Sequence, residues 1–118
     1  MAGEIDEAQL REVMKTQGFD FDQAQLKYQQ SFGHTESNEP HAEVKLPSGV
    51  QVLSAASSLS GDLGKLIWGL PYLEMAKFVI CALNGIVNEH RALMKAVQKC
   101  ASSRWPELVT DPDEPAPT

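Results

Sequence analysis

Cysteines and long uncharged apolar runs are scarce in this chain of 118 residues, which has two cysteines. Cys81 and Cys100 fall on one predicted helix and would lie about 28 Å apart along it, too far to pair within a chain. We therefore expect reduced thiols and a cytoplasmic protein. The N-terminal segment MAGEIDEAQLRE is acidic and lacks the apolar core of a signal peptide. The apolar run 70–87 includes charged residues and is too short to span a membrane.

Signatures of catalysis and of metal binding are missing as well. His34 and His41 fall in a polar segment where nothing orients them, and His90 falls on the apolar side of a predicted helix. Cys100 lies on that same helix about 15 Å from His90, too far to be activated by it. The spacing of the histidines and their acidic neighbours matches no standard metal site, and the GDLG segment lacks the fingerprint of a phosphate loop. We predict that the protein is not an enzyme and uses no cofactor or metal.

The net charge of −6 is unevenly distributed. Residues 1–43 carry a net charge of −6, residues 44–104 a net charge of +4, and residues 105–118 a net charge of −4. Acidic ends flank a mildly basic body, which disfavours nonspecific binding to nucleic acid. One basic row remains on a predicted helix, with its members one turn apart: Arg91, Lys95 and Lys99. This row is either a solvated face or a contact for phosphates or for an acidic partner surface.

Apolar residues at helical spacing predict one long amphipathic helix from Tyr72 to Ser103. Two adjacent apolar rows make its face wider than a coiled-coil seam. Pro71 suits the first turn of this helix, and Pro106 follows its end. The first row consists of Tyr72, Ala76, Val79, Leu83, Ile86, His90, Leu93, Val97 and Cys100, and the second consists of Leu73, Ile80, Val87, Met94 and Ala101.

The length of this helix, roughly 48 Å, exceeds the diameter of a compact chain of this size, roughly 35 Å. One chain cannot easily cover the whole apolar face, so we predict a homodimer built along it. The alternative is a helix that is broken near Gly85 and folded back as two core helices. The residues expected at the centre of the dimer interface are Leu83, Ile86, His90, Leu93 and Val97.

Two short helices are predicted at the N-terminus. The first covers residues 4–17 and can end at Gly18, and the second begins after Asp20, whose side chain can cap it. Isolated helices of this length are marginal in water. This N-terminal arm must therefore dock, either on the chain's own long helix or on a partner. The aromatic residues on one face of the second helix are Phe21, Tyr28 and Phe32.

A further helix is predicted immediately before the long one. Ser48 can cap it, and apolar residues continue at helical spacing to Leu70, although the segment VQVL also suits a hairpin strand. The connection to the long helix is very short, so the two helices would form an antiparallel hairpin. Trp68 at its corner and Phe78 beside the apolar rows are aromatic residues of the kind that anchor interfaces. Otherwise both pack inside the chain.

The predicted fold class is therefore all-α, with short N-terminal helices followed by a long antiparallel helical hairpin, in a dimer. Its parts are an N-terminal helical arm at residues 1–32, a polar linker at 33–43, a helical hairpin at 44–105 and an acidic tail at 106–118. The tail is rich in proline and acidic residues, a composition typical of disorder.

The segments VKLPSGVQVLSAASSLSGDL and LPYLEMAKFVICALNGIVNEHRALM, within residues 44–103, resemble small helical regulators of pseudomonad bacteria of the QslA type. These regulators are quorum-sensing antiactivators that bind LuxR-type transcription factors and block their dimerisation. The resemblance rests on size, acidity and helix order rather than on a motif, so no site residue is carried over. It implies a dimeric protein that inhibits by occupying the dimer surface of its partner.

The predicted function is protein–protein inhibition by an antiactivator. It would sequester a partner, expected to be a LuxR-type transcription regulator, by occupying the dimerisation surface of that partner. Two alternatives remain, a phage-type inhibitor of a bacterial defence complex and a nucleic-acid-associated helical dimer that uses the basic row. The residues expected to contact the partner are Phe21, Tyr28, Phe32, Trp68 and Phe78.

Overall fold

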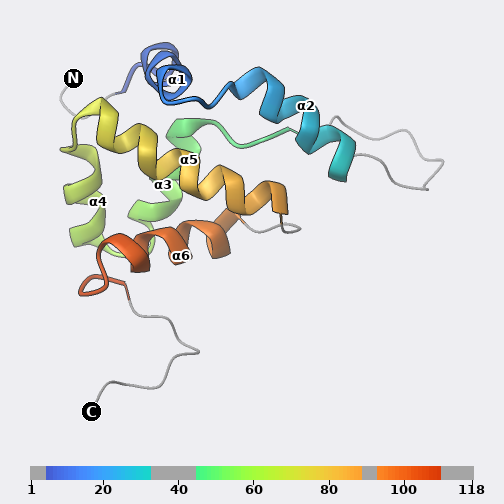
Figure 1. The fold of residues 1–118 in the computed structure, drawn as a ribbon. Coiled ribbons are helices and arrows are strands. Elements are labelled where there is room, and N and C mark those ends of the chain that lie inside the picture. Colours follow the sequence, from blue (N-terminus) through green and yellow to red (C-terminus); the bar gives the residue numbers. More distant parts are fainter. Residues whose placement is uncertain (1–4, 33–44, 89–92, 110–118) are drawn as a thin grey trace.

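A computed structural model describes residues 5–32, 45–88 and 93–109. Within these residues the chain forms six α-helices and no strand, which confirms the all-α prediction. Figure 1 shows α5 crossing the middle of the molecule, with α1 and α2 on one side of it and α6 on the other. The helices are α1 (Glu7–Thr16), α2 (Phe21–Phe32), α3 (Gly49–Ser57), α4 (Gly61–Trp68), α5 (Tyr72–Asn88) and α6 (Leu93–Arg104).

The first N-terminal helix begins at Glu7 rather than at residue 4, but it ends before Gly18 and the second helix begins after Asp20, as predicted. The Asp6 carboxylate accepts a hydrogen bond from the Ala8 N–H at the start of α1, and Gly18 follows α1 with a φ of 92°. The Asp20 carboxylate accepts hydrogen bonds from the N–H groups of Asp22 and Gln23 at the start of α2. These caps satisfy donors that have no partner inside the helix, so local sequence is enough to set both boundaries.

The predicted helix before the corner is two helices rather than one. Ser48 and Gln51 form a capping box at the start of α3, which confirms the predicted cap and excludes a strand at VQVL. The first helix ends at Ser57, and Ser60 caps α4 by accepting from the Leu63 N–H. A Cβ on Gly64 would lie 3.0 Å from Ser57, so the missing side chain lets α4 fold back against α3.

The prediction of one unbroken helix from Tyr72 to Ser103 is wrong. Cys81 on α5 and Cys100 on α6 form a disulfide, with their Cα atoms 6.3 Å apart, whereas a continuous helix would separate them by about 28 Å. The two helices therefore lie side by side within one chain. The prediction that these cysteines cannot pair within a chain is wrong for the same reason. The cytoplasmic location inferred from reduced thiols stays a prediction.

The alternative of a folded-back helix was closer, although α5 continues through Gly85 to Asn88. Gly85 is a contact point between α5 and α6 rather than a break. A Cβ at this position would lie 3.0 Å from Ala96 Cβ. Small residues at this contact let the two helix axes approach closely. The pair is also joined by an ion pair between Arg104 and Glu74, with 2.9 Å between Nη2 and Oε1.

The hydrophobic core surrounds α5, which leaves one exposed stripe on that helix. Helices α1, α2, α3 and α6 all pack against it, so residues on several sides of α5 are buried at once. The N-terminal arm is thereby docked on its own chain, and Leu10 and Met14 of α1 are fully buried in this core. The exposed stripe consists of Leu73, Lys77, Cys81 and Asn84.

This packing contradicts the placement predicted for the dimer interface. Leu83 and Val97 are fully buried and Ile86 is 1% exposed, all within one chain, so they cannot also face a second copy in this conformation. Leu93 is half-buried against the same core, and His90 lies outside the described residues. The error arose because the apolar rows are covered by α1, α3 and the folded-back α6 rather than by another protein.

Candidate functional site

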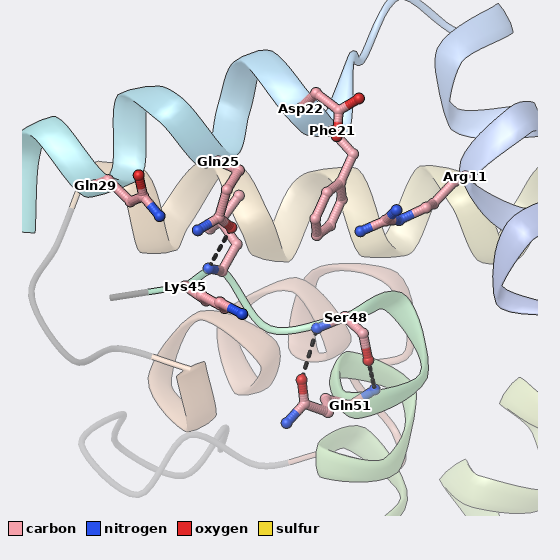
Figure 2. A pocket seen from close by; sticks show the side chains of 9 residues that line it. Arg11, Phe21, Asp22, Gln25, Gln29, Lys45, Ser48 and Gln51 are labelled. Carbon is pink, nitrogen blue, oxygen red and sulfur yellow. Dashed lines mark hydrogen bonds between the residues drawn. The ribbon is translucent and has the colours of Figure 1, made fainter. Parts of the chain in front are cut away.

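A groove lies between α2 and the segment that leads into α3. It has a volume of about 380 Å³ and is open to solvent. Figure 2 shows α2 along one side of this groove and residues 45–48 along the other. We call it the α2 groove. Its lining residues are Arg11, Phe21, Asp22, Gln25, Gln29, Lys45, Leu46, Ser48 and Gln51.

An aromatic ring and a cation close one end of the α2 groove. Phe21 points from the start of α2 towards the 45–48 segment and is 9% exposed (Figure 2). The Arg11 guanidinium from α1 lies 4.1 Å from the centre of this ring, a distance at which a cation is attracted to the ring face. The contact brings the positive charge of Arg11 to the groove.

Two glutamines hold residues 46–48 in place by their carbonyl oxygens. The Gln25 side-chain oxygen accepts a hydrogen bond of 2.6 Å from the Leu46 N–H, which ties α2 to the 45–48 segment. The Gln51 side-chain oxygen accepts from the Ser48 N–H at 2.7 Å. The two hydrogen bonds therefore fix residues 46–48 relative to α2 and to the start of α3.

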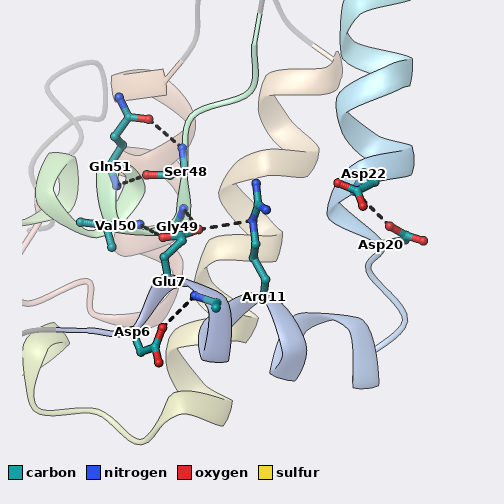
Figure 3. A network of polar contacts seen from close by, with 10 residues as sticks. Asp6, Glu7, Arg11, Asp20, Asp22, Ser48, Gly49, Val50 and Gln51 are labelled. Carbon is teal, nitrogen blue, oxygen red and sulfur yellow. Dashed lines mark hydrogen bonds and ion pairs between the residues drawn. The ribbon is translucent and has the colours of Figure 1, made fainter.

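Glu7 on α1 holds the first residues of α3, which follow the 45–48 wall of the groove. Its two carboxylate oxygens accept hydrogen bonds of 3.0 Å from the N–H groups of Gly49 and Val50 at the start of α3 (Figure 3). A carboxylate there satisfies unpaired donors and complements the positive end of the helix dipole. Glu7 also faces Arg11, with 3.8 Å between Oε2 and Nε. The start of α3 is therefore occupied by the chain's own carboxylate and is not an anion site.

Gly49 makes this arrangement possible. A Cβ at Gly49 would lie 2.5 Å from Leu10 Cδ2 on α1, closer than real carbon atoms approach. The absence of a side chain lets the start of α3 come near enough to α1 for Glu7 to reach it. Tyr72 adds a second tie to α1, because its hydroxyl accepts from the Asp6 N–H at 2.9 Å. The groove is thus built on a fixed junction of α1, α3 and α5.

Large apolar side chains remain exposed on four of the described helices. Leu26 on α2 is 51% exposed and Met94 on α6 is 45% exposed. Leu66 and Leu73 are 38% and 41% exposed, on either side of the turn between α4 and α5. Leu26 is three residues before Gln29 on the same helix, so both side chains lie on adjoining faces of α2. Leu26 thus adds an apolar contact beside the α2 groove.

Among the five aromatic residues predicted to contact a partner, those whose side chains are described are not brought together. Phe21 alone among them lines the α2 groove, and Tyr28 is half-buried against the core. The Trp68 indole N–H donates to the Ser57 hydroxyl at 2.7 Å, which packs the ring between α3 and α4. Phe32 ends α2, and its side chain lies outside the described residues.

The placement of Phe78 as an exposed anchor is wrong. Phe78 is fully buried, and its ring centre lies 5.6 Å from that of Trp105, which follows α6. The sequence placed Phe78 towards the polar side because one apolar stripe was assumed for this helix. The physical reason for the difference is that α5 is surrounded by other helices, so side chains outside the main stripe are buried too.

Most of the α2 groove was missed in the sequence. The available signal is the spacing of Phe21, Gln25 and Gln29, which recur every four residues and so share one face of α2. A second signal is the spacing of Glu7 and Arg11, also four residues apart. The contribution of Lys45 and Leu46 could not be read locally, because a chain segment of 12 residues separates them from the end of α2.

The described part of the chain also bears on metal sites, membrane-spanning helices and the basic row. No group of three or more His, Cys, Asp or Glu side chains there is placed to hold a metal ion. None of the helices described is long and apolar enough to cross a membrane. Lys95 and Lys99 are exposed on α6, while Arg91, His34 and His41 lie outside the described residues. The basic row therefore stays a prediction.

Comparison with protein-family models, with curated proteins and with solved structures found no match.

Proposed function

We propose that this chain binds another protein through α2 and the α2 groove, and that it inhibits its partner by covering a surface the partner needs for its own assembly. One observation carries the proposal. Leu26, which is 51% exposed, directly follows Gln25 on α2, and Gln25 lines a groove of about 380 Å³ and is hydrogen-bonded to Leu46 across it. An apolar anchor beside fixed polar groups is typical of protein interfaces.

The lining of the groove indicates which part of a partner enters it. The lining is mixed, with the cations Arg11 and Lys45, the amide of Gln29 and the carboxylate of Asp22. An extended peptide segment presents both an N–H and a carbonyl oxygen at nearly every residue, so it offers partners to donors and acceptors alike. We therefore expect an extended segment of the partner in the groove, with an apolar side chain against Leu26.

A stable complex buries more surface than the groove itself supplies, so the partner must also contact residues outside the groove. A typical interface buries about 1,600 Å² in total, more than one short groove supplies. The outer face of α2 is the natural extension, because it carries Leu26 and continues from the groove. The apolar rows of α5 and α6 do not contribute in this conformation, since Leu83 and Val97 are fully buried.

The resemblance to QslA-type antiactivators gives the partner its expected class, a LuxR-type transcription regulator. Such a regulator works as a dimer, so occupying its dimer surface would silence it. A partner of this kind also places the proposed action in the cytoplasm. The mechanism is competition between two surfaces for the same site, and it uses no chemical step.

The test is a titration of the full-length chain into a purified LuxR-type regulator, followed by calorimetry and light scattering. We expect the regulator dimer to be replaced by a mixed complex. The substitution Leu26→Lys should weaken binding by at least tenfold, because loss of an interface anchor typically costs about 2 kcal/mol or more and tenfold in affinity corresponds to about 1.4 kcal/mol. Gln29→Glu should also weaken binding, because it exchanges a donor in the groove for a negative charge.

The matched control is Met94→Lys, which changes a residue of similar exposure on α6. Its affinity should remain within about twofold of the unmodified chain, since a surface change away from a contact has little effect. An equal loss of affinity in Met94→Lys and Leu26→Lys would reject α2 as the binding surface. A regulator that stays dimeric at saturating concentrations of the chain would reject the antiactivator proposal as a whole.

A further inference from the structure

The disulfide between Cys81 and Cys100 is a covalent link between α5 and α6. Its two ends differ in environment. Cys81 lies on the exposed stripe of α5, whereas Cys100 is 6% exposed and belongs to the core. A soluble thiol can therefore approach the bond from the side of Cys81. The link is accessible to reduction even though one of its sulfur atoms is buried.

The disulfide and a continuous helix exclude each other. The apolar rows of the sequence continue from Tyr72 to Cys100 at helical spacing. A helix that followed this pattern throughout would hold the two cysteines about 28 Å apart, but their Cα atoms are 6.3 Å apart. The covalent bond thus fixes the folded-back arrangement of α5 and α6.

The contacts that hold α6 suit a second copy of the chain as well as its own. Arg104 pairs with Glu74, Trp105 packs on Phe78, and Ala96 lies against Gly85. Each of these contacts joins α6, or the residue that follows it, to α5. If α6 is exchanged between two copies, every one of these contacts is made again across the pair, so the exchange loses little packing energy.

We propose that the Cys81–Cys100 disulfide is a reducible latch that confines α6 to its own chain, and that reduction of this bond lets two copies exchange α6 to form a dimer. The partner is a second copy of this chain. In the dimer, Glu74 of one copy pairs with Arg104 of the other, and Gly85 of one copy lies against Ala96 of the other. The proposal is independent of the α2 groove, because α2 is not exchanged.

The opening of the latch is thiol–disulfide exchange with a dithiol reductant. A thiolate of the reductant attacks the exposed Cys81 sulfur, so that a new S–S bond forms while the Cys81–Cys100 bond breaks. Cys100 leaves as a thiolate and takes a proton from water. The second thiol of the reductant then displaces Cys81, which leaves two thiols on the chain and a disulfide in the reductant. A reducing compartment therefore favours the exchanged dimer, and an oxidising one holds the closed monomer.

The experiment measures the mass of the full-length chain in solution over a range of concentrations, with and without dithiothreitol. The oxidised chain should remain at its monomer mass of 12.9 kDa. The reduced chain should reach twice that mass at high concentration. The double substitution Cys81→Ser with Cys100→Ser should give the dimer in both conditions, which separates loss of the bond from other effects of the reductant.

Reoxidation of the isolated dimer identifies the exchange itself. Cys81 of one copy then lies beside Cys100 of the other, so a covalent dimer should appear on a non-reducing gel, and peptide mapping should find links between Cys81 and Cys100 of different copies. Links between two Cys81 residues, or closed monomers alone, would overturn the exchange. A reduced chain that stays monomeric, or that loses its helical circular dichroism, would overturn the latch.

Discussion

Helices α2 and α6 both have 12 residues, and both lie against α5. Their attachment differs. Helix α6 is joined to α5 by a disulfide, an ion pair and the close Gly85–Ala96 contact. Helix α2 lies between two hollows of about 380 and 270 Å³ and exposes Leu26 to water. The tightly packed helix completes the core, and the loosely packed helix offers a surface for binding.

This difference shows why the apolar rows predict burial but not association. A strongly apolar helix such as α5 indicates burial, but it does not say whether the covering surface comes from the same chain or another. In this molecule α1, α3 and α6 supply the cover. The weakly apolar α2 retains accessible polar and apolar side chains, as interfaces of independently stable proteins do.

The largest expected effect is a difference in the free energy of unfolding between variants in the core around α5 and variants on the surface of α2. Phe78→Ala should lower the free energy of unfolding by about 3–5 kcal/mol, because it removes a fully buried aromatic ring. Leu26→Ala should change it by about 0.5 kcal/mol or less. Chemical denaturation measures both. Similar losses for the two variants would show that α2 is packed as firmly as the core and would remove the contrast.

The second effect tests the covalent attachment of α6. Replacing both cysteines with serine should lower the stability of the monomer by about 3 kcal/mol at dilute concentration, as expected for a closed loop of about 20 residues. The comparison is between the oxidised chain and the double variant in urea. An unchanged unfolding midpoint would show that the noncovalent contacts of α6 are sufficient without the bond.

A third, smaller effect tests the hydrogen bonds between Glu7 and the start of α3. Glu7→Ala should lower stability by about 1 kcal/mol, because it leaves the N–H groups of Gly49 and Val50 without their carboxylate partner. Glu12→Ala is the control, since Glu12 is an exposed acidic residue of the same helix. Thermal unfolding of both variants is the measurement. Equal shifts would mean that helix propensity, rather than the cap on α3, explains the loss.

The smallest expected effect is a gain of stability in α6. The Ser102 hydroxyl is buried and has no hydrogen-bond partner among the described residues. Ser102→Ala should raise the free energy of unfolding by about 1 kcal/mol, since a buried unpaired polar group is costly. Ser103→Ala, at an exposed neighbouring position, should give a smaller change. A loss of stability in Ser102→Ala would indicate that the hydroxyl has a partner.

Features set by neighbouring residues were predictable from the sequence. The caps at Asp20 and Ser48 and the end of the first helix at Gly18 were all predicted and are all present. Each depends on a few adjacent residues whose side chains satisfy nearby backbone donors. The all-α class followed in the same way, because helical periodicity is a local property.

Features that depend on distant parts of the chain were not predictable in this way. Gly85 was weighed as a weak point of a helix, whereas its missing side chain serves the approach of Ala96. Phe78 was placed by the stripe of its own helix, although Trp105 and the surrounding helices decide its burial. The α2 groove required Lys45 and Leu46 to return to α2 from a distance in the sequence. Periodicity carries no information on such pairings.

Helix α6 folds back on α5 within one chain, and the distance between residues 73 and 103 tests this fold-back most directly. Spin labels introduced there through unnatural amino acids leave the disulfide intact. A continuous helix would separate these positions by roughly 45 Å. The contact between Arg104 and Glu74 instead predicts half that distance or less in the dilute oxidised monomer. A distance near the full helical value would contradict the fold-back.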